Sequence, residues 1–370
     1  MTSQDWEVLV LAVVVAVTCA LPGVYLVLRR MALLSDAISH SILLGIVLAF
    51  FWVRDLNSPV LVLAAGATGV LMVAMVEALH RTRLVKEDAA IALVFPALFS
   101  LAVLLISRHA GDVHLDVDAV LLGEIAFAPF RRWVVGGIDL GPRALWMMLG
   151  ILAANLLFLL SLHKEMKVAT FDAGLAAAMG FSPVLLHYAF MSLVSVTAVG
   201  AFDAVGSILV VALMIAPPAA ARLLTDRLGL LLPLAAGIAA GSAALGFFGA
   251  ILLDASIAGS MASAAGLVFA GVLLGAPERG IVAEVRRRRE QRLEFAVRML
   301  LIHLLNHEGG PREAEENRAD HLAGHLRWSR DFARRVVRRA VREGQLERRG
   351  GEGLALTPLG REVARHVMTR

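Results

Sequence analysis

Long apolar runs separated by short polar segments make up the first three quarters of the chain. Several runs reach or approach the ~20 residues that an α-helix needs to cross the hydrocarbon core of a bilayer. We therefore predict an all-α fold, a polytopic membrane helix bundle with about nine spans. The expected spans are 7–28, 31–53, 58–80, 88–107, 144–162, 184–203, 205–224, 230–252 and 257–276.

The pattern changes completely after Pro277, where an arginine run precedes an amphipathic segment and a polar loop. Ser329 is a favourable cap for a basic helix over 330–343, and Gly344 is a favourable end for it. Alternation over 346–356 predicts a small hairpin, followed by a last helix. Helix, helix, hairpin, helix is the order of a winged helix-turn-helix. The apolar face of the amphipathic segment is Phe295, Val297, Leu300, Leu301 and Leu304.

Composition supports this division of the chain. The residues are 58% hydrophobic and 18% charged, whereas about 25% of the residues in soluble globular proteins are charged. A wholly soluble protein is therefore excluded. We expect a transmembrane domain at 1–277, a basic linker at 278–291 and a soluble domain at 292–370.

The basic segments between spans predict the orientation, because cytoplasmic loops are enriched in lysine and arginine. The N-terminus is expected outside and the soluble domain in the cytoplasm. Arg131, Arg132 and Arg143 are exceptions, since they come out external, and the interrupted run 117–130 is expected to be re-entrant. Pro217-Pro218 is expected to break the seventh span. The basic segments expected inside are Arg29-Arg30, 81–86, 164–167, Arg222 with Arg227, and 286–289.

Asp36 and His40 stand at membrane depth in the second span. Residues four apart lie on one face of a helix, and ionisable residues inside a membrane usually face a bundle interior or an aqueous path. A carboxylate beside an imidazole suits Mn, Fe(II) or Zn. The alternative is that the two residues bond to each other, or to Ser35 and Ser39, as a contact between helices.

The segment 164–183 is polar at one end and then rich in small residues, and it is too short and broken to span. It is either a cytoplasmic docking element or an ordinary connector. The chain has no G-x-x-x-x-G-K-[ST] phosphate-binding loop. Any ATP hydrolysis is therefore expected in a partner chain, and this chain is not predicted to be an enzyme.

Five separated stretches resemble the metal-transporting ABC permeases, the family of manganese, zinc and iron importers. The first, LRRMALLSDAISHSILLG at 28–45, contains Asp36 and His40. The others are 86–107, 115–124, 164–180 and 202–224, in the order found in the family. Together the resemblance covers about 5–277.

This resemblance implies a type II ABC importer permease in the cytoplasmic membrane, moving a divalent transition metal. It implies a second permease chain, identical or related, a separate ATP-binding subunit and an extracytoplasmic metal-binding protein. No permanently bound cofactor is expected. Asp36 and His40 correspond to the family's Asp and His, and a twofold interface would bring two of each together. Mn, Zn and Fe remain open, since all accept these ligands.

The resemblance also assigns a coupling helix, the cytoplasmic element that rests in a groove on the ATPase. Small residues would allow close approach, and two larger apolar residues would anchor the contact. The residues concerned are Phe171, Asp172, Ala173, Gly174, Leu175, Ala176, Ala177, Ala178, Met179 and Gly180.

Residues 296–366 resemble the winged-helix portion of metal-dependent repressors. An arginine stripe on the expected recognition helix suits phosphate contact with nucleic acid, while basic segments near a membrane also bind anionic lipid or another subunit. Two histidine pairs, 303/307 and 321/325, are either metal ligands or part of a solvated face. The stripe is Arg330, Arg334, Arg335, Arg338, Arg339 and Arg342.

Two other classes of function compete with the permease. A secondary transporter or channel would work without ATPase partners, and a membrane-anchored metal-responsive transcription regulator would use the apolar part as a sensor. Neither class accounts for five ordered permease motifs.

Overall fold

The computed structural model describes residues 2–54, 58–109, 125–135, 138–311, 317, 328–349 and 353–368. The chain divides into two compact units, Met1–Pro277 and Glu278–Arg370. Each unit has its own hydrophobic core.

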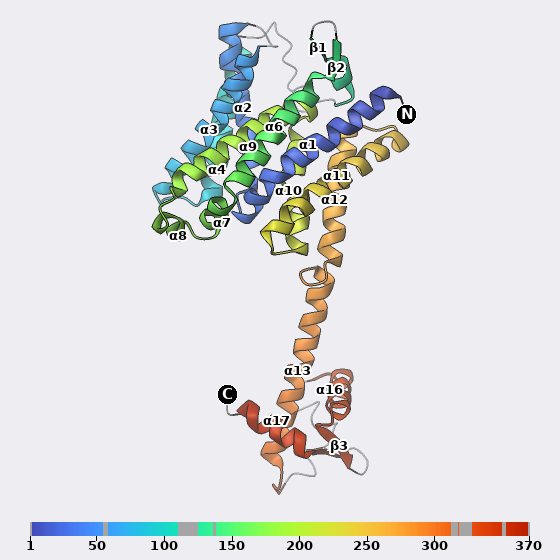
Figure 1. The fold of residues 1–370 in the computed structure, drawn as a ribbon. Coiled ribbons are helices and arrows are strands. Elements are labelled where there is room, and N and C mark those ends of the chain that lie inside the picture. Colours follow the sequence, from blue (N-terminus) through green and yellow to red (C-terminus); the bar gives the residue numbers. More distant parts are fainter. Residues whose placement is uncertain are drawn as a thin grey trace. The chain divides into compact units, whose positions relative to one another are not determined.

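The first unit is a bundle of long apolar helices (Figure 1). Among the described residues, nine helices are long and apolar enough to cross a membrane. Their ends lie within a few residues of those that the apolar runs predicted, because bilayer thickness sets the length of each run. The nine are α1 (Ser3–Leu28), α2 (Ala32–Val53), α3 (Pro59–Arg81), α4 (Glu87–His109), α6 (Arg143–Ser161), α9 (Pro183–Val205), α10 (Ser207–Leu224), α11 (Leu228–Leu253) and α12 (Ile257–Gly275).

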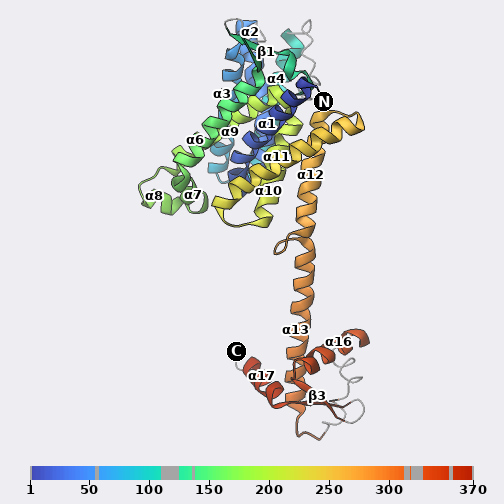
Figure 2. The same ribbon diagram turned by 45° about the vertical axis from the view of Figure 1, so that its right-hand side comes forward.

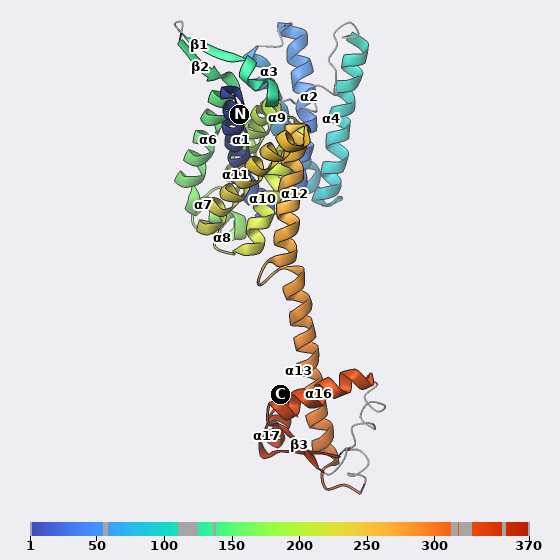
Figure 3. The same cartoon turned by 90° about the vertical axis from the view of Figure 1, so that its right-hand side faces the viewer.

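Helix α1 is the centre of this bundle. It is buried on nearly all faces from Leu11 to Leu26, as expected for a helix that is apolar all round. It packs against α10 and α11 and also against α6 and α9. Helix α2 packs mainly on α3 and α4, and these three stand together at one side of the bundle (Figure 3).

A glycine of α1 lies against the proline pair of α10 where the two helices pack. Helix α10 continues through Pro217 and Pro218, so the prediction that this pair breaks the span is wrong. Pro218 has no N–H for the carbonyl of Met214, four residues earlier. Gly23 brings α1 against that carbonyl, since a Cβ at position 23 would lie 2.1 Å from the Met214 oxygen. Close coverage by a neighbouring helix explains why the interruption is tolerated within the membrane.

A small β-hairpin, which the sequence pattern did not predict, lies between α4 and α6 in the chain. Strand β1 (Arg132–Val135) pairs antiparallel with β2 (Ile138–Pro142), with Val135 opposite Ile138. A short 3₁₀ helix, η1 (Ile125–Phe130), precedes it. Of the run 117–130 that was expected to be re-entrant, residues 117–124 lie outside the described residues.

Two short helices lie at the end of the bundle opposite the hairpin (Figure 2). They are α7 (His163–Phe171) and α8 (Ala173–Ala178), and they connect α6 to α9. Asp172 ends the first and caps the second, because its carboxylate accepts a hydrogen bond from the Leu175 amide at 2.9 Å.

The second unit begins with one long helix, α13 (Ile281–His307). Most of the segment 278–291, expected as a linker, is therefore helical. The later half of α13 buries Val297, Leu300, Leu301 and Leu304, as predicted, but Phe295 is 67% exposed. Phe295 lies two residues before Val297, and such neighbours point to different sides of a helix.

The remaining elements of this unit follow the predicted order. They are α16 (Arg330–Arg342), the antiparallel strands β3 (Leu346–Arg349) and β4 (Gly353–Leu356), and α17 (Pro358–Met368). Ser329 caps α16 by accepting a hydrogen bond from the Phe332 amide, and Gly344 follows the helix at φ +69°. The core that joins these elements to α13 includes Val336, Val337, Leu354 and Leu356.

Candidate functional site

The two predicted metal ligands lie on adjacent turns of α2. Nε2 of His40 is 3.4 Å from Oδ1 of Asp36, and the side chains are 30% and 47% exposed, respectively. Four residues span slightly more than one helical turn, which stacks the two groups on one face. The sequence spacing therefore correctly placed an imidazole beside a carboxylate.

Helix α4 supports the imidazole. The ring centroid of His40 lies 6.1 Å from that of Phe95 and 5.9 Å from that of Phe99, the second contact being nearly perpendicular. Edge-to-face packing of this kind fixes the plane of a ring. One turn of α4 thus limits the directions in which His40 presents its nitrogens.

The serines next to the pair are engaged elsewhere. Both are buried, and their hydroxyls donate to carbonyls of their own helix: Ser35 to Ala32 at 2.8 Å and Ser39 to Ser35 at 2.9 Å. The alternative interpretation was that Asp36 and His40 bond to each other or to the two serines. Of these contacts, the structure shows the one between Asp36 and His40. The two serines instead fill the buried side of α2.

One chain supplies few metal ligands. Among the described residues, no group of three or more His, Cys, Asp or Glu side chains is placed to hold a metal ion. A pair of ligands is an incomplete coordination shell for a transition metal, which usually takes four or more. The ligand pair of this chain is therefore at most half of a site.

A cavity of about 640 Å³ lies beside the C-terminal half of α4. Its lining begins at Phe99, which contacts His40, and continues along the helix to Arg108 near the end of α4. The lining residues are Phe99, Ser100, Val103, Leu104, Ser107 and Arg108.

The predicted coupling segment presents its larger apolar residues to the surface. Phe171, Leu175 and Met179 are 62%, 51% and 56% exposed, whereas Ala176 is buried. The buried alanine faces the bundle, and the three larger side chains form an exposed apolar surface, a feature that often marks an interaction site. Gly180 ends the segment with φ +88°, a conformation that favours glycine.

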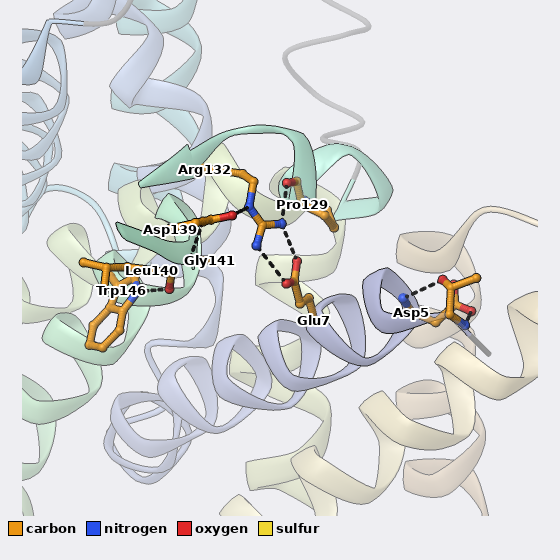
Figure 4. Close-up of polar contacts among 9 residues, drawn as sticks. Asp5, Glu7, Pro129, Arg132, Asp139, Leu140, Gly141 and Trp146 are labelled. Atoms are coloured by element: carbon orange, nitrogen blue, oxygen red, sulfur yellow. Dashed lines mark hydrogen bonds and ion pairs between the residues drawn. The ribbon is translucent and has the colours of Figure 1, made fainter. Parts of the chain in front are cut away.

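The arginines that violated the positive-inside pattern are paired with acids. Arg132 donates from Nη1 and Nη2 to the two carboxylate oxygens of Glu7, both at 3.1 Å, and from Nε to Asp139 (Figure 4). Arg131 lies 3.7 Å from Asp203. The hydrogen bond from the Gly141 amide lowers the pKa of Asp139 below its usual range, and the contact with Arg132 lowers it further. Two of the three arginines near the hairpin, Arg131 and Arg132, therefore have acidic partners close by.

Exposed arginines cover one face of α16. Arg339 is partly covered and bonds to Glu343 at 2.8 Å, and Arg334 lies 3.9 Å from Asp331. The other face of the helix enters the core. Of the two histidine pairs, the rings of His303 and His307 are 4.7 Å apart, while residues 321 and 325 lie outside the described residues.

Comparison with known proteins identifies the first unit. Residues 5–276 match the model of the ABC 3 transport family. The chain belongs to this family. Membership covers nearly all of the first unit, and it establishes a multi-pass membrane permease subunit that works with a separate ATPase and is not itself an enzyme.

Two named relatives of this ABC 3 family chain illustrate the likeness. The zinc transport system membrane protein TroD of Treponema pallidum is 49% identical over 358 residues, covering 97% of each chain. The manganese transport system membrane protein MntD of Bacillus subtilis is 43% identical, covering 80% of this chain and all of that protein. The similarity to TroD thus includes the second unit.

A solved structure has a fold similar to that of this chain. PsaBC from Streptococcus pneumoniae, in complex with Fab, is similar to this chain with a TM-score of 0.63 and 27% identity. The match covers 75% of this chain and 94% of the other.

Proposed function

We propose that this chain is the permease subunit of an ABC importer that moves a divalent transition metal across the cytoplasmic membrane. The metal would contact Asp36 and His40. Separate ATP-binding subunits would supply the energy, and an extracytoplasmic binding protein would deliver the ion. The observation that carries the proposal is the carboxylate–imidazole pair on α2, in a chain of the ABC 3 family. Relatives named for zinc and manganese transport support a transition metal as substrate.

Exposure of Asp36 supports a second permease chain. A carboxylate that is 47% exposed on the side of a membrane bundle is costly against lipid and is expected to face protein or water. Leu33, three residues before it on the same helix, is also exposed, and further leucines are about half exposed elsewhere on α2 and on its neighbour α4: Leu48, Leu93 and Leu101. A twofold interface here would cover this surface and bring two carboxylates and two imidazoles together, a ligand set of mixed hardness that suits Mn, Zn or Fe(II).

Metal uptake by reconstituted complexes tests the proposal. Asp36→Asn and His40→Gln are expected to abolish ATP-dependent uptake of the metal while leaving membrane insertion and ATPase-subunit binding intact. Asp254→Asn is the matched control, because it makes the same change at the C-terminal cap of α11. Normal uptake in both α2 variants would refute the site, and uptake without ATP would favour a secondary transporter or channel.

The exposed side of α7 and α8 is proposed as the contact with the ATP-binding subunit. The support is the exposure of Phe171, Leu175 and Met179 at the end of the bundle opposite the hairpin. Co-purification of the ATP-binding subunit should fail for Leu175→Glu, whereas Leu359→Glu, the same change of a similarly exposed leucine on α17 outside the membrane spans, should leave this contact in place.

For the second unit we propose a cytoplasmic winged-helix domain whose α16 arginines contact phosphate groups. The element order and the exposed arginine face support this role. Nucleic acid is the ligand to be tested, with anionic lipid as the competing outcome. The full-length protein is assayed with duplex DNA and with vesicles, with and without phosphatidylserine. DNA affinity that falls steeply with salt would favour nucleic acid, and binding only to the anionic vesicles would refute it.

A further inference from the structure

Arg29 occupies the short turn that joins α1 to α2. It is the C-terminal cap of α1, and Arg30 follows in the left-handed region at φ +63°. Met31 then caps α2, so Asp36 lies about one helical turn inside that helix. A displacement of Arg29 is therefore transmitted to the beginning of the helix that carries the ligand pair.

The Arg29 side chain reaches across to α7. Its Nε donates to Oγ1 of Thr170 at 3.1 Å, and Nη2 lies 3.9 Å from the sulfur of Met166. Thr170 directly precedes Phe171, the first residue of the proposed ATPase contact. Met166 is fully buried, so the start of α7 is fixed against the bundle.

The same guanidinium also packs on α9. Its carbon lies 5.1 Å from the ring centroid of Phe190, a cation–π distance. Phe190 is buried and makes an edge contact with Tyr25 of α1 at 5.8 Å. One side chain thus contacts α7 and α9 while its own backbone begins the turn into α2.

Lysine cannot reproduce this set of contacts. The planar guanidinium stacks on an aromatic face while its edge donates hydrogen bonds, whereas an ammonium is a compact and strongly hydrated point charge. The geometry therefore depends on arginine itself as well as on positive charge.

We propose that Arg29 is a positioning residue that couples the ATPase-facing segment to the metal-bearing helix. When the ATP-binding subunits move α7 and α8, the bond to Thr170 carries the displacement to the turn before α2. This inference rests on the proposed function, since it presumes both the ATPase contact and the ligand pair. Arg29 itself touches neither the metal nor ATP.

The number of metal ions taken up per ATP hydrolysed tests this role in proteoliposomes containing the complete transporter. Arg29→Gln is expected to lower this ratio about tenfold, while the ATP-binding subunit still co-purifies. Arg29→Lys should also lower it. Arg30→Gln is the matched control, because it removes a neighbouring, exposed positive charge, and it should keep the wild-type ratio.

Thr170→Val keeps the test decisive if the Arg29 variants do not fold. It removes the hydroxyl that accepts from Arg29 and preserves side-chain volume, and a two- to fivefold lower ratio is expected. An unchanged ratio in Thr170→Val, or in a folded Arg29→Gln complex, would overturn the inference. If Asp36→Asn and His40→Gln also transported normally, the proposed metal site would fail as well. If those two variants lost uptake while the Arg29 and Thr170 variants kept the wild-type ratio, only the coupling role would fail.

Discussion

Asn155 makes a sharp prediction about the stability of the membrane bundle. It is fully buried on α6, and its Nδ2 donates to the carbonyl of Thr18 on α1 and to Oγ1 of Thr197 on α9, both at 3.1 Å. The Thr18 carbonyl would normally accept from the amide four residues later, but residue 22 is proline and has no N–H. Asn155 therefore supplies a hydrogen bond that Pro22 removed.

We predict that Asn155→Leu destabilises the bundle by about 1–2 kcal/mol. Leaving a buried acceptor unpaired costs about 1–3 kcal/mol, but polar contacts between membrane helices average only ~0.6 kcal/mol and reach ~1.7. The upper part of the membrane range is expected here, because the Thr18 carbonyl has no helical donor to return to. Leucine has the same number and branching of side-chain heavy atoms as asparagine, so no cavity is expected.

A double-mutant cycle with Pro22→Ala isolates the mechanism. Alanine restores the amide at position 22, so Asn155→Leu should cost less in that background, by about 1 kcal/mol if the Thr18 bond carries most of the effect. Unfolding in mixed detergent micelles, followed by circular dichroism, measures each free energy. Ser161→Ala is the control on α6, since that exposed hydroxyl bonds within its own helix. An equal cost of Asn155→Leu in both backgrounds would refute the reasoning.

Two further predictions concern close packing and pH. Gly45→Ala should destabilise the bundle by about 1–3 kcal/mol in the same unfolding assay. The reason is that the new Cβ would lie 2.4 Å from the Ala64 carbonyl oxygen. Gly66→Ala is the control and should not destabilise the bundle, because a Cβ at position 66 would meet open space. The hydrogen bond from Arg361 lowers the pKa of Glu308 in the folded protein. The stabilisation that this bond provides is therefore complete above the unfolded pKa of ~4.3. It is lost as the pH falls through the lower pKa of the folded protein. The protection factor against hydrogen exchange near the end of α13, which corrects for the intrinsic rate at each pH, should therefore fall on acidification more in wild type than in Glu308→Gln; equal decreases would contradict this assignment.

The sequence predicted the spans well because each must match the same bilayer thickness. The C-terminal elements were also predictable from local signals, such as Ser329 before α16 and Gly344 after it. The hairpin was missed because its strands have four and five residues, too few for a clear periodicity. Pro217 and Pro218 misled the prediction because their tolerance depends on Gly23 of another helix.

For the candidate site, spacing alone placed Asp36 beside His40. It did not reveal Phe95 and Phe99, because the contact joins different helices, and it gave no reason to select Asn155 or Arg29. An isolated asparagine or an arginine at a helix end has many ordinary roles, and only the neighbours distinguish them. The identity of the metal and the second half of the site stay predictions.

The bond between Glu7 and Arg132 has a consequence for biogenesis. The two residues are 125 positions apart, and α2, α3 and α4 are synthesised between them. The first helix is therefore synthesised before the guanidinium that will hold its N-terminal end exists. Loss of Arg132 should leave early insertion intact and appear only as a defect in the final assembly of the hairpin on α1.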